Sequence, residues 1–184
     1  MINFLYKILL TFNSTSMLLV IYCIDEQKLI NWLSVAPKFT NIPDFVSYVI
    51  YLLIPILLTL FSLWLAKFLD TDSIEESKIT EVEQANNAFL PSYLGYFFVA
   101  LSVKEFEVLK YVFLILFVFT YFSQTLYFNP LFLLFKYQFY YVTTVNGVKI
   151  FIITRRTLKN PSKIHFKNLK RINDYTFIDI NKEQ

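Results

Sequence analysis

The chain has 184 residues, of which 56% are hydrophobic and only 17% are charged, with a net charge of +3. Soluble domains carry about 25% charged residues, so the composition disfavours an ordinary soluble protein and favours a membrane protein. The chain contains one cysteine, Cys23, and one histidine, His165. These counts exclude a disulfide framework and a Cys/His metal site within one chain.

Four apolar stretches, which together contain a single charged residue, Lys7, predict four transmembrane helices. A bilayer core about 30 Å thick needs roughly 20 apolar residues in a helix. The predicted spans cover residues 4–24, 45–66, 88–103 and 111–128. The expected fold class is therefore a mainly α membrane protein, with a four-helix transmembrane region over residues 1–128 and a small tail that contains a β-hairpin.

The first two spans contain residues that are unusual inside a membrane. Thr11, Asn13 and Ser14 form a polar patch in the middle of the first span. Such residues hydrogen-bond between packed helices, so we interpret the patch as a helix-packing face rather than a permeation path. Pro55 lies in the middle of the second span, where it removes one helical hydrogen bond and predicts a kink.

The distribution of lysine and arginine predicts the orientation of the four spans. Basic residues concentrate on the cytoplasmic side of membrane proteins. With both termini in the cytoplasm, 13 basic residues lie inside and four lie outside, whereas the inverted topology reverses these numbers. We therefore expect a multi-pass protein with both termini in the cytoplasm.

The loop between the second and third spans is acidic, with six acidic residues and one lysine over residues 70–87. Ser73 and Glu76 match the spacing of a capping box, which marks the start of a helix. This pattern predicts a short cytoplasmic helix over about residues 74–87.

Residues 129–184 form the predicted cytoplasmic tail. Asn146-Gly147 separates two runs that are rich in β-branched and aromatic residues, which predicts a β-hairpin over residues 137–154. A lone hairpin is marginally stable in water. It is therefore expected to pack against a third strand, the 164–172 segment or another subunit.

The tail is also basic, and three interpretations of its charge remain open. The charge could set the topology and attract anionic lipids. It could instead dock onto the acidic 70–83 loop or onto an acidic partner. Direct binding of nucleic acid is the weakest interpretation, because the hairpin aromatics also suit a small β core. The residues concerned are Arg155, Arg156, Lys159, Lys163, Lys167, Lys170 and Arg171.

The sequence offers no residues for a catalytic, cofactor or metal site. No predicted span carries an acidic residue, a histidine or a central lysine, the groups that mark proton relays and ion-coupled transport. There is also no glycine-rich phosphate loop and no cluster of metal-ligand residues. We therefore expect a protein that is not an enzyme and binds no cofactor.

The junction of the fourth span and the tail resembles the membrane subunit of the Kiwa anti-phage defence system. The resemblance covers the whole chain, and the residues that carry it are Phe128-Asn129-Pro130, Tyr137-Gln138-Phe139-Tyr140, Asn146-Gly147 and Ile153-Thr154-Arg155-Arg156. It implies a sensor of phage infection that oligomerises in the bacterial inner membrane. It also implies a cytoplasmic, DNA-binding partner subunit, which would dock on the hairpin and the basic tail.

Two other functions compete with a non-enzymatic sensor or scaffold. A holin-like, pore-forming effector would place Thr11, Asn13 and Ser14 around an oligomer axis. A small channel or transporter subunit is the third candidate, although the spans contain no substrate-binding constellation. The folded tail favours the sensor, since holin-like proteins rarely need one.

Overall fold

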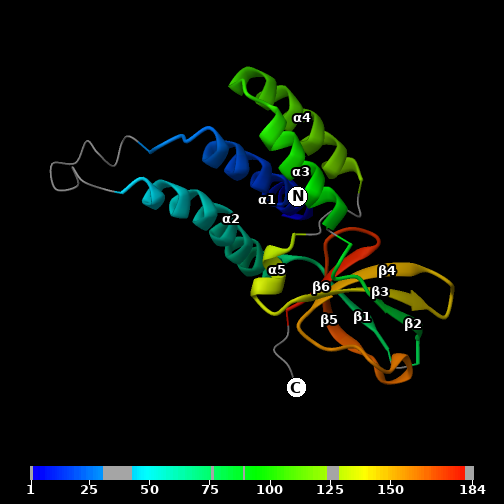
Figure 1. Cartoon of the computed structure of the whole chain (residues 1–184). Coiled ribbons are helices and arrows are strands. Elements are labelled where there is room, and N and C mark those ends of the chain that lie inside the picture. Colours follow the sequence, from blue (N-terminus) through cyan, green and yellow to red (C-terminus); the bar gives the residue numbers. More distant parts are fainter. Residues whose placement is uncertain (1, 31–42, 76, 89, 124–128, 181–184) are drawn as a thin grey trace.

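Helices and strands occupy separate parts of this protein, with a layer of apolar helices beside a six-stranded sheet (Figure 1). The structure is a computed structural model that describes residues 2–30, 43–75, 77–88, 90–123 and 129–180. The chain passes from the helices into the sheet after α2 and returns to the helices after β2. Both parts are therefore built from segments that are distant in sequence.

The helical layer contains α1, which packs against α2, α3 and α4. A short 3-10 turn, η2 (Ala66–Phe68), leads from α2 into the sheet, and a one-turn helix, α5, leads from the helices into β3. The bounds are α1 (Ile2–Asp25), α2 (Phe45–Leu65), α3 (Leu90–Ser102), α4 (Phe106–Phe122) and α5 (Leu131–Leu134).

The prediction of four membrane spans is wrong. Among the described residues, two helices are long and apolar enough to cross a membrane, Asn3–Asp25 and Phe45–Phe68. The span predicted at 88–103 contains α3, whose 13 residues reach only about 20 Å at 1.5 Å per residue. The span predicted at 111–128 contains most of α4, which ends at Phe122, while residues 124–128 lie outside the described part. The chain is therefore not a four-helix membrane protein.

The sheet has the strand order β1-β5-β6-β4-β3-β2. All neighbouring strands are antiparallel except β4 and β6, which are parallel. A 3-10 turn, η3 (Pro161–Lys163), precedes β5. The strands are β1 (Thr71–Ile74), β2 (Ile79–Gln84), β3 (Gln138–Thr144), β4 (Lys149–Thr154), β5 (Phe166–Arg171) and β6 (Thr176–Asp179).

The sheet is curled, because β1 and β2 lie at opposite edges although only residues 75–78 separate them. Six flat strands, about 4.8 Å apart, would hold the two edges about 24 Å apart. The chain from Ile74 to Ile79 spans at most about 18 Å. The two edges must therefore bend toward each other.

The inner strands of the curled sheet are buried on both faces, whereas the edge strands β1 and β2 are largely exposed. Along β3, Phe139 belongs to a core that the sheet shares with the helices, whereas Tyr140 and Val142 belong to a second core on the opposite face. Leu158 and Ile164, from the segment around η3, close this second core. Successive side chains of a strand point to opposite faces of the sheet, so one strand contributes to both cores.

The predicted helix over residues 74–87 is wrong, because this segment supplies β2 and the end of β1. Ile74, Ile79 and Val82 are β-branched, which suits a strand. Their pairing partners are β5 and β3, which come from the tail. The sheet is thus not confined to residues 129–184, and tertiary pairing overrides the local capping-box pattern.

The hairpin that Asn146-Gly147 predicts is present as β3 and β4, which form one part of the larger sheet. Gly147 has a φ of +76°, in the left-handed region that side chains with a Cβ disfavour. We expect Gly147→Ala to lower the free energy of unfolding by about 1 kcal/mol, since the strain is conformational and no atom lies within 4 Å of the added carbon.

Gly95 provides a matched control for this change. It lies inside α3, and an added Cβ there also meets no atom within 4 Å. Gly95→Ala should be neutral or stabilise by up to about 1 kcal/mol, because alanine is the better helix former. Thermal unfolding of both variants in detergent checks the prediction, and equal effects of the two changes would contradict it.

Candidate functional site

The helical layer and the sheet share one apolar core, and α5 lies at its centre. Phe132 of α5 is fully buried, and its ring packs edge-on against Tyr137 and Phe139, at centroid distances of 6.1 and 6.3 Å. Tyr6 and Leu10, from the start of α1, belong to the same core. We call this the joint core, because it fixes the helices to one face of the sheet.

A buried polar network lies beside the joint core and is centred on Thr59 of α2. The Thr59 hydroxyl accepts hydrogen bonds from the amides of Asn13 (2.8 Å) and Asn129 (3.3 Å) and donates one to the Pro55 carbonyl (2.8 Å). Asn129 in turn accepts a hydrogen bond from the Leu131 backbone N–H (2.9 Å). This Thr59 network therefore links α1, α2 and the start of α5.

The predicted polar patch of α1 lies within this helix packing. Thr11, Asn13 and Ser14 are all buried. Thr11 donates to the Lys7 carbonyl (2.8 Å) and Ser14 to the Thr11 carbonyl (2.9 Å), both within α1. Asn13 is the member of the patch that bonds to another helix. Pro55 lies one turn from Thr59, inside α2, which continues through it.

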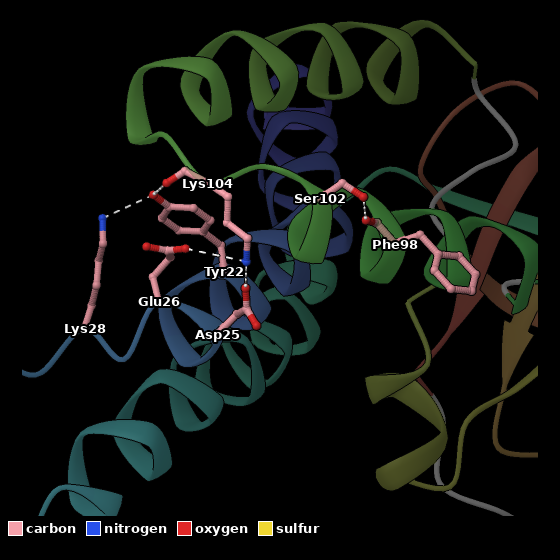
Figure 2. A network of polar contacts seen from close by, with 7 residues as sticks. All are labelled: Tyr22, Asp25, Glu26, Lys28, Phe98, Ser102 and Lys104. Atoms are coloured by element: carbon pink, nitrogen blue, oxygen red, sulfur yellow. Dashed lines mark hydrogen bonds and ion pairs between the residues drawn. The ribbon is translucent and has the colours of Figure 1, made fainter.

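A second polar network closes the far end of the helical layer (Figure 2). Lys104, in the turn between α3 and α4, forms an ion pair with Asp25 (2.9 Å) and a longer one with Glu26 (3.9 Å). The hydrogen bond to Asp25 raises the pKa of Lys104. The Tyr22 hydroxyl donates to the Lys104 carbonyl (3.3 Å) and accepts from Lys28 (3.4 Å). The end of α1 is thereby fastened to the α3–α4 turn.

Two of the predicted basic site residues hold the sheet together. Lys170 donates to the Leu69 carbonyl (3.0 Å) and to the Thr71 hydroxyl (2.8 Å). Arg171 forms an ion pair with Asp72 of β1 (2.5 Å), and its hydrogen bond lowers the pKa of that carboxyl. Part of the acidic segment is thus bound by the basic tail of the same chain.

Two other predicted basic residues, Arg155 and Arg156, are half-buried against aromatic rings. The Arg155 guanidinium lies 4.6 Å from the centre of the Tyr137 ring. Arg156 lies 5.0 Å from the centre of the Phe166 ring and donates to the His165 carbonyl (2.8 Å). Cation–π contacts of this kind orient the arginines along the sheet.

The remaining predicted basic residues, Lys159, Lys163 and Lys167, are exposed and form no ion pair within the described part of the chain. We call them the basic loop: Lys159 precedes η3, Lys163 is its last residue, and Lys167 follows at the start of β5. This segment, orange in Figure 1, lies at the end of the sheet away from the helices. A hollow of about 470 Å³ beside it is lined by Lys167, Glu75 and Phe166, among others.

The family model of the anti-phage protein KwaA matches residues 6–178. The chain belongs to the KwaA family. The match runs through both the helical layer and the sheet, so family membership applies to the whole architecture, and its role is anti-phage defence. No curated protein and no solved structure that was compared matches the chain.

Sequence reasoning missed three residues that connect the two parts of this KwaA-family protein, Thr59, Asn129 and Phe132. The sequence contains a signal for Thr59, because a polar residue in the apolar 45–66 stretch can hydrogen-bond to the polar patch of α1. Asn129 precedes Pro130, which indicates only a helix stop. Within the described residues, no three His, Cys, Asp or Glu side chains gather as metal ligands.

Proposed function

We propose that this protein is a non-enzymatic membrane sensor and scaffold of anti-phage defence, which signals infection to a cytoplasmic DNA-binding partner. The observation that carries the proposal is the connection between apolar helices and a charged sheet. The joint core and the Thr59 network give the helices a direct mechanical route to the strands.

The apolar helices support a membrane location for the sensing part. α1 and α2 have the length and composition of membrane spans, and the outer face of α2 exposes large apolar side chains such as Leu57 and Trp64. Large apolar side chains that are exposed together on one face mark membrane or protein contacts. In the proposal, these faces meet lipid and further copies of the same chain in the bacterial inner membrane.

The position of the start of α1 supports one orientation. The start of α1 packs in the joint core, so the N-terminal end lies on the same side of the helical layer as the sheet. The chain segment around η3, which carries the basic loop, lies farther out on that side (Figure 1). Because basic segments stay in the cytoplasm, the proposal puts the sheet and both ends of the chain there.

The proposed signal is a change in the packing of α1 against α2. Asn13 and Thr59 lie at that contact, and Asn129 connects it to the first residues of α5. Phe132 of α5 belongs to the joint core, and its ring packs against Phe139 of β3. A shift at the helix pair would therefore move α5 against β3, and a two-state packing element of this kind is what transmission requires.

The basic loop is the proposed docking surface for the partner. Of the seven predicted basic residues, Lys159, Lys163 and Lys167 are the exposed ones whose charge no described acidic group neutralises. A partner with an acidic surface would therefore be attracted there. Arg155, Arg156, Lys170 and Arg171 have structural contacts, so their proposed role is to hold the sheet that presents the loop.

Charge reversal of the basic loop tests the docking proposal. We expect Lys159→Glu, Lys163→Glu and Lys167→Glu together to reduce co-purification of the partner in mild detergent at least tenfold, a difference of about 1.4 kcal/mol. Conversion of the same residues to arginine keeps the charge and should leave co-purification unchanged. Wild-type co-purification by the glutamate variant would show that the partner docks elsewhere. Point changes are preferable to truncation at residue 146, which removes β4, β5 and β6.

The pore-forming alternative receives less support from the geometry. Its candidate lining residues, Thr11, Asn13 and Ser14, are buried inside a single chain. They would have to leave that packing in order to face an oligomer axis. Liposomes that contain the pure protein should therefore retain an entrapped dye, and rapid leakage would favour the pore.

A further inference from the structure

An apolar groove of about 490 Å³ runs between α1 and α4, at the end of the helical layer away from the sheet. We propose that this groove binds one phospholipid, with an acyl chain along its floor and the phosphate at Lys28 and Lys110. The proposal rests on the membrane location in the proposed function. It adds the chemical class of molecule that the helical layer would contact specifically.

The floor of the groove has the shape and chemistry that an acyl chain requires. The α4 residues at positions 106, 109, 110, 113 and 114 line one side, and positions 106, 109 and 113 have the three- and four-residue spacing of one helix face. This side is about 12 Å long, since each residue advances the helix by about 1.5 Å. Leu19 and Cys23 of α1 line the other side. The charged residue of the lining is Lys110, whose ammonium lies beside Phe106 at one end of the groove.

Two ammonium groups lie at one end of this floor. The Lys28 ammonium is 4.7 Å from the centre of the Tyr22 ring and 4.8 Å from that of Phe106. The Lys110 ammonium is 5.5 Å from the centre of the same Phe106 ring. Both rings belong to the groove lining, so the aromatic pair holds the two cations at its mouth.

The charges around the mouth leave Lys28 without an acidic partner. Asp25 and Glu26 pair with Lys104, and Glu107 pairs with Lys110 (2.7 Å). Among the described residues, Lys28 has the Tyr22 hydroxyl as its hydrogen-bond partner. The phosphodiester of a lipid carries one negative charge and would supply the acidic partner that Lys28 lacks.

The remaining charge at the mouth favours a head group with an amine. Glu105 is exposed, precedes the groove residue Phe106, and forms no ion pair within the described part of the chain. A zwitterionic head group such as phosphoethanolamine would place its phosphate at Lys28 and its ammonium toward Glu105. The cationic mouth would thus contact the head group of a phospholipid, and the apolar floor would contact its acyl chain.

Native mass spectrometry of the full chain in detergent tests the assignment with phosphatidylethanolamine as the probe. We expect Lys28→Gln to reduce retained phosphatidylethanolamine at least fivefold. Cys23→Trp, which fills the floor, should reduce it similarly while Lys28 stays in place. Lys67→Gln is the matched control, because Lys67 is an exposed lysine in η2, at the other end of the helices, and it should retain wild-type binding.

Two further probes separate the head group from the chain. Diacylglycerol has the acyl chains without the phosphate, and glycerophosphoethanolamine has the phosphate without the chains; both should be retained at least fivefold less than the intact lipid. Equal retention by wild type and Lys28→Gln, or equal retention of diacylglycerol and phosphatidylethanolamine, would overturn the assignment. The measurement uses the isolated chain, so its failure leaves partner docking at the basic loop to be judged separately.

Discussion

Replacing Phe132 with alanine is expected to lower the free energy of unfolding by about 3–5 kcal/mol. The ring is fully buried and contacts Tyr137 and Phe139 at the meeting point of helices and sheet. Removing it leaves a cavity that rigid strands on one side cannot close. The melting temperature in detergent should fall by about 6–20 °C, since each kcal/mol shifts it by about 2–4 °C in a chain of this size.

Leu134 supplies the control within the same helical turn. Its side chain is 66% exposed, so Leu134→Ala removes surface rather than core and should change stability by less than about 0.5 kcal/mol. The comparison separates loss of the joint core from loss of helix α5. If Phe132→Ala melted within 2 °C of Leu134→Ala, roughly the effect of 1 kcal/mol, the joint core would not be what holds the two parts together.

Thr59→Val is expected to cost about 3 kcal/mol, although valine has nearly the same shape as threonine. The change removes the hydroxyl that accepts from Asn13 and Asn129, and it leaves two buried amides without that partner. Each unsatisfied buried polar group costs about 1–3 kcal/mol. If the proposed signal route is correct, protection of cells against phage should fall even at a temperature where the variant remains folded.

Thr59→Ser retains the hydroxyl and is the control for this experiment. It should keep most of the stability and the anti-phage protection, apart from a loss of about 1 kcal/mol for the missing methyl group. Melting in detergent and plaque counts at matched expression measure the two effects. Full protection by a folded Thr59→Val protein would remove the Thr59 network from the signal route.

The sequence predicts those parts of the fold whose cause is local. The two stretches at residues 4–24 and 45–66, which contain one charged residue between them, correspond to α1 and α2, the two described helices long and apolar enough to span a bilayer. Asn146-Gly147 predicts the β3–β4 turn, because a left-handed backbone at Gly147 needs no distant partner. For the other two apolar stretches, lack of charge alone overestimated the length of the helix. The helical part of each stretch is shorter than the apolar run itself.

The missed strands have a cause that lies elsewhere in the chain. Residues 74–87 carry a helix-start motif and many acidic side chains, and both features are compatible with a solvated helix. Their strand conformation depends on pairing with β3 and β5 and on ion pairs such as Glu83 with Lys149 (2.8 Å). The local sequence of the segment does not indicate that its pairing partners are β3 and β5.

The basic site residues are also only partly predictable from the sequence. The number of basic residues identifies residues 155–171 as the basic region. The sequence does not distinguish the lysines that face solvent from the arginines that pack on aromatic rings. That separation follows from strand register and from contacts with β1. The basic loop is therefore defined by the fold, while its net charge is visible in the sequence.

The order of the strands also delays the pairing of β1 while the chain is being synthesised. Thr71 of β1 pairs with Lys170 of β5, so about 100 residues must be translated before β1 has a neighbour. At about 5–20 residues per second, this delay lasts roughly 5–20 seconds. An unpaired strand is a template for aggregation, and charged side chains along it suppress that reaction. The acidic residues Asp72, Glu81 and Glu83 therefore keep β1 and β2 apart from other chains until the C-terminal strands emerge.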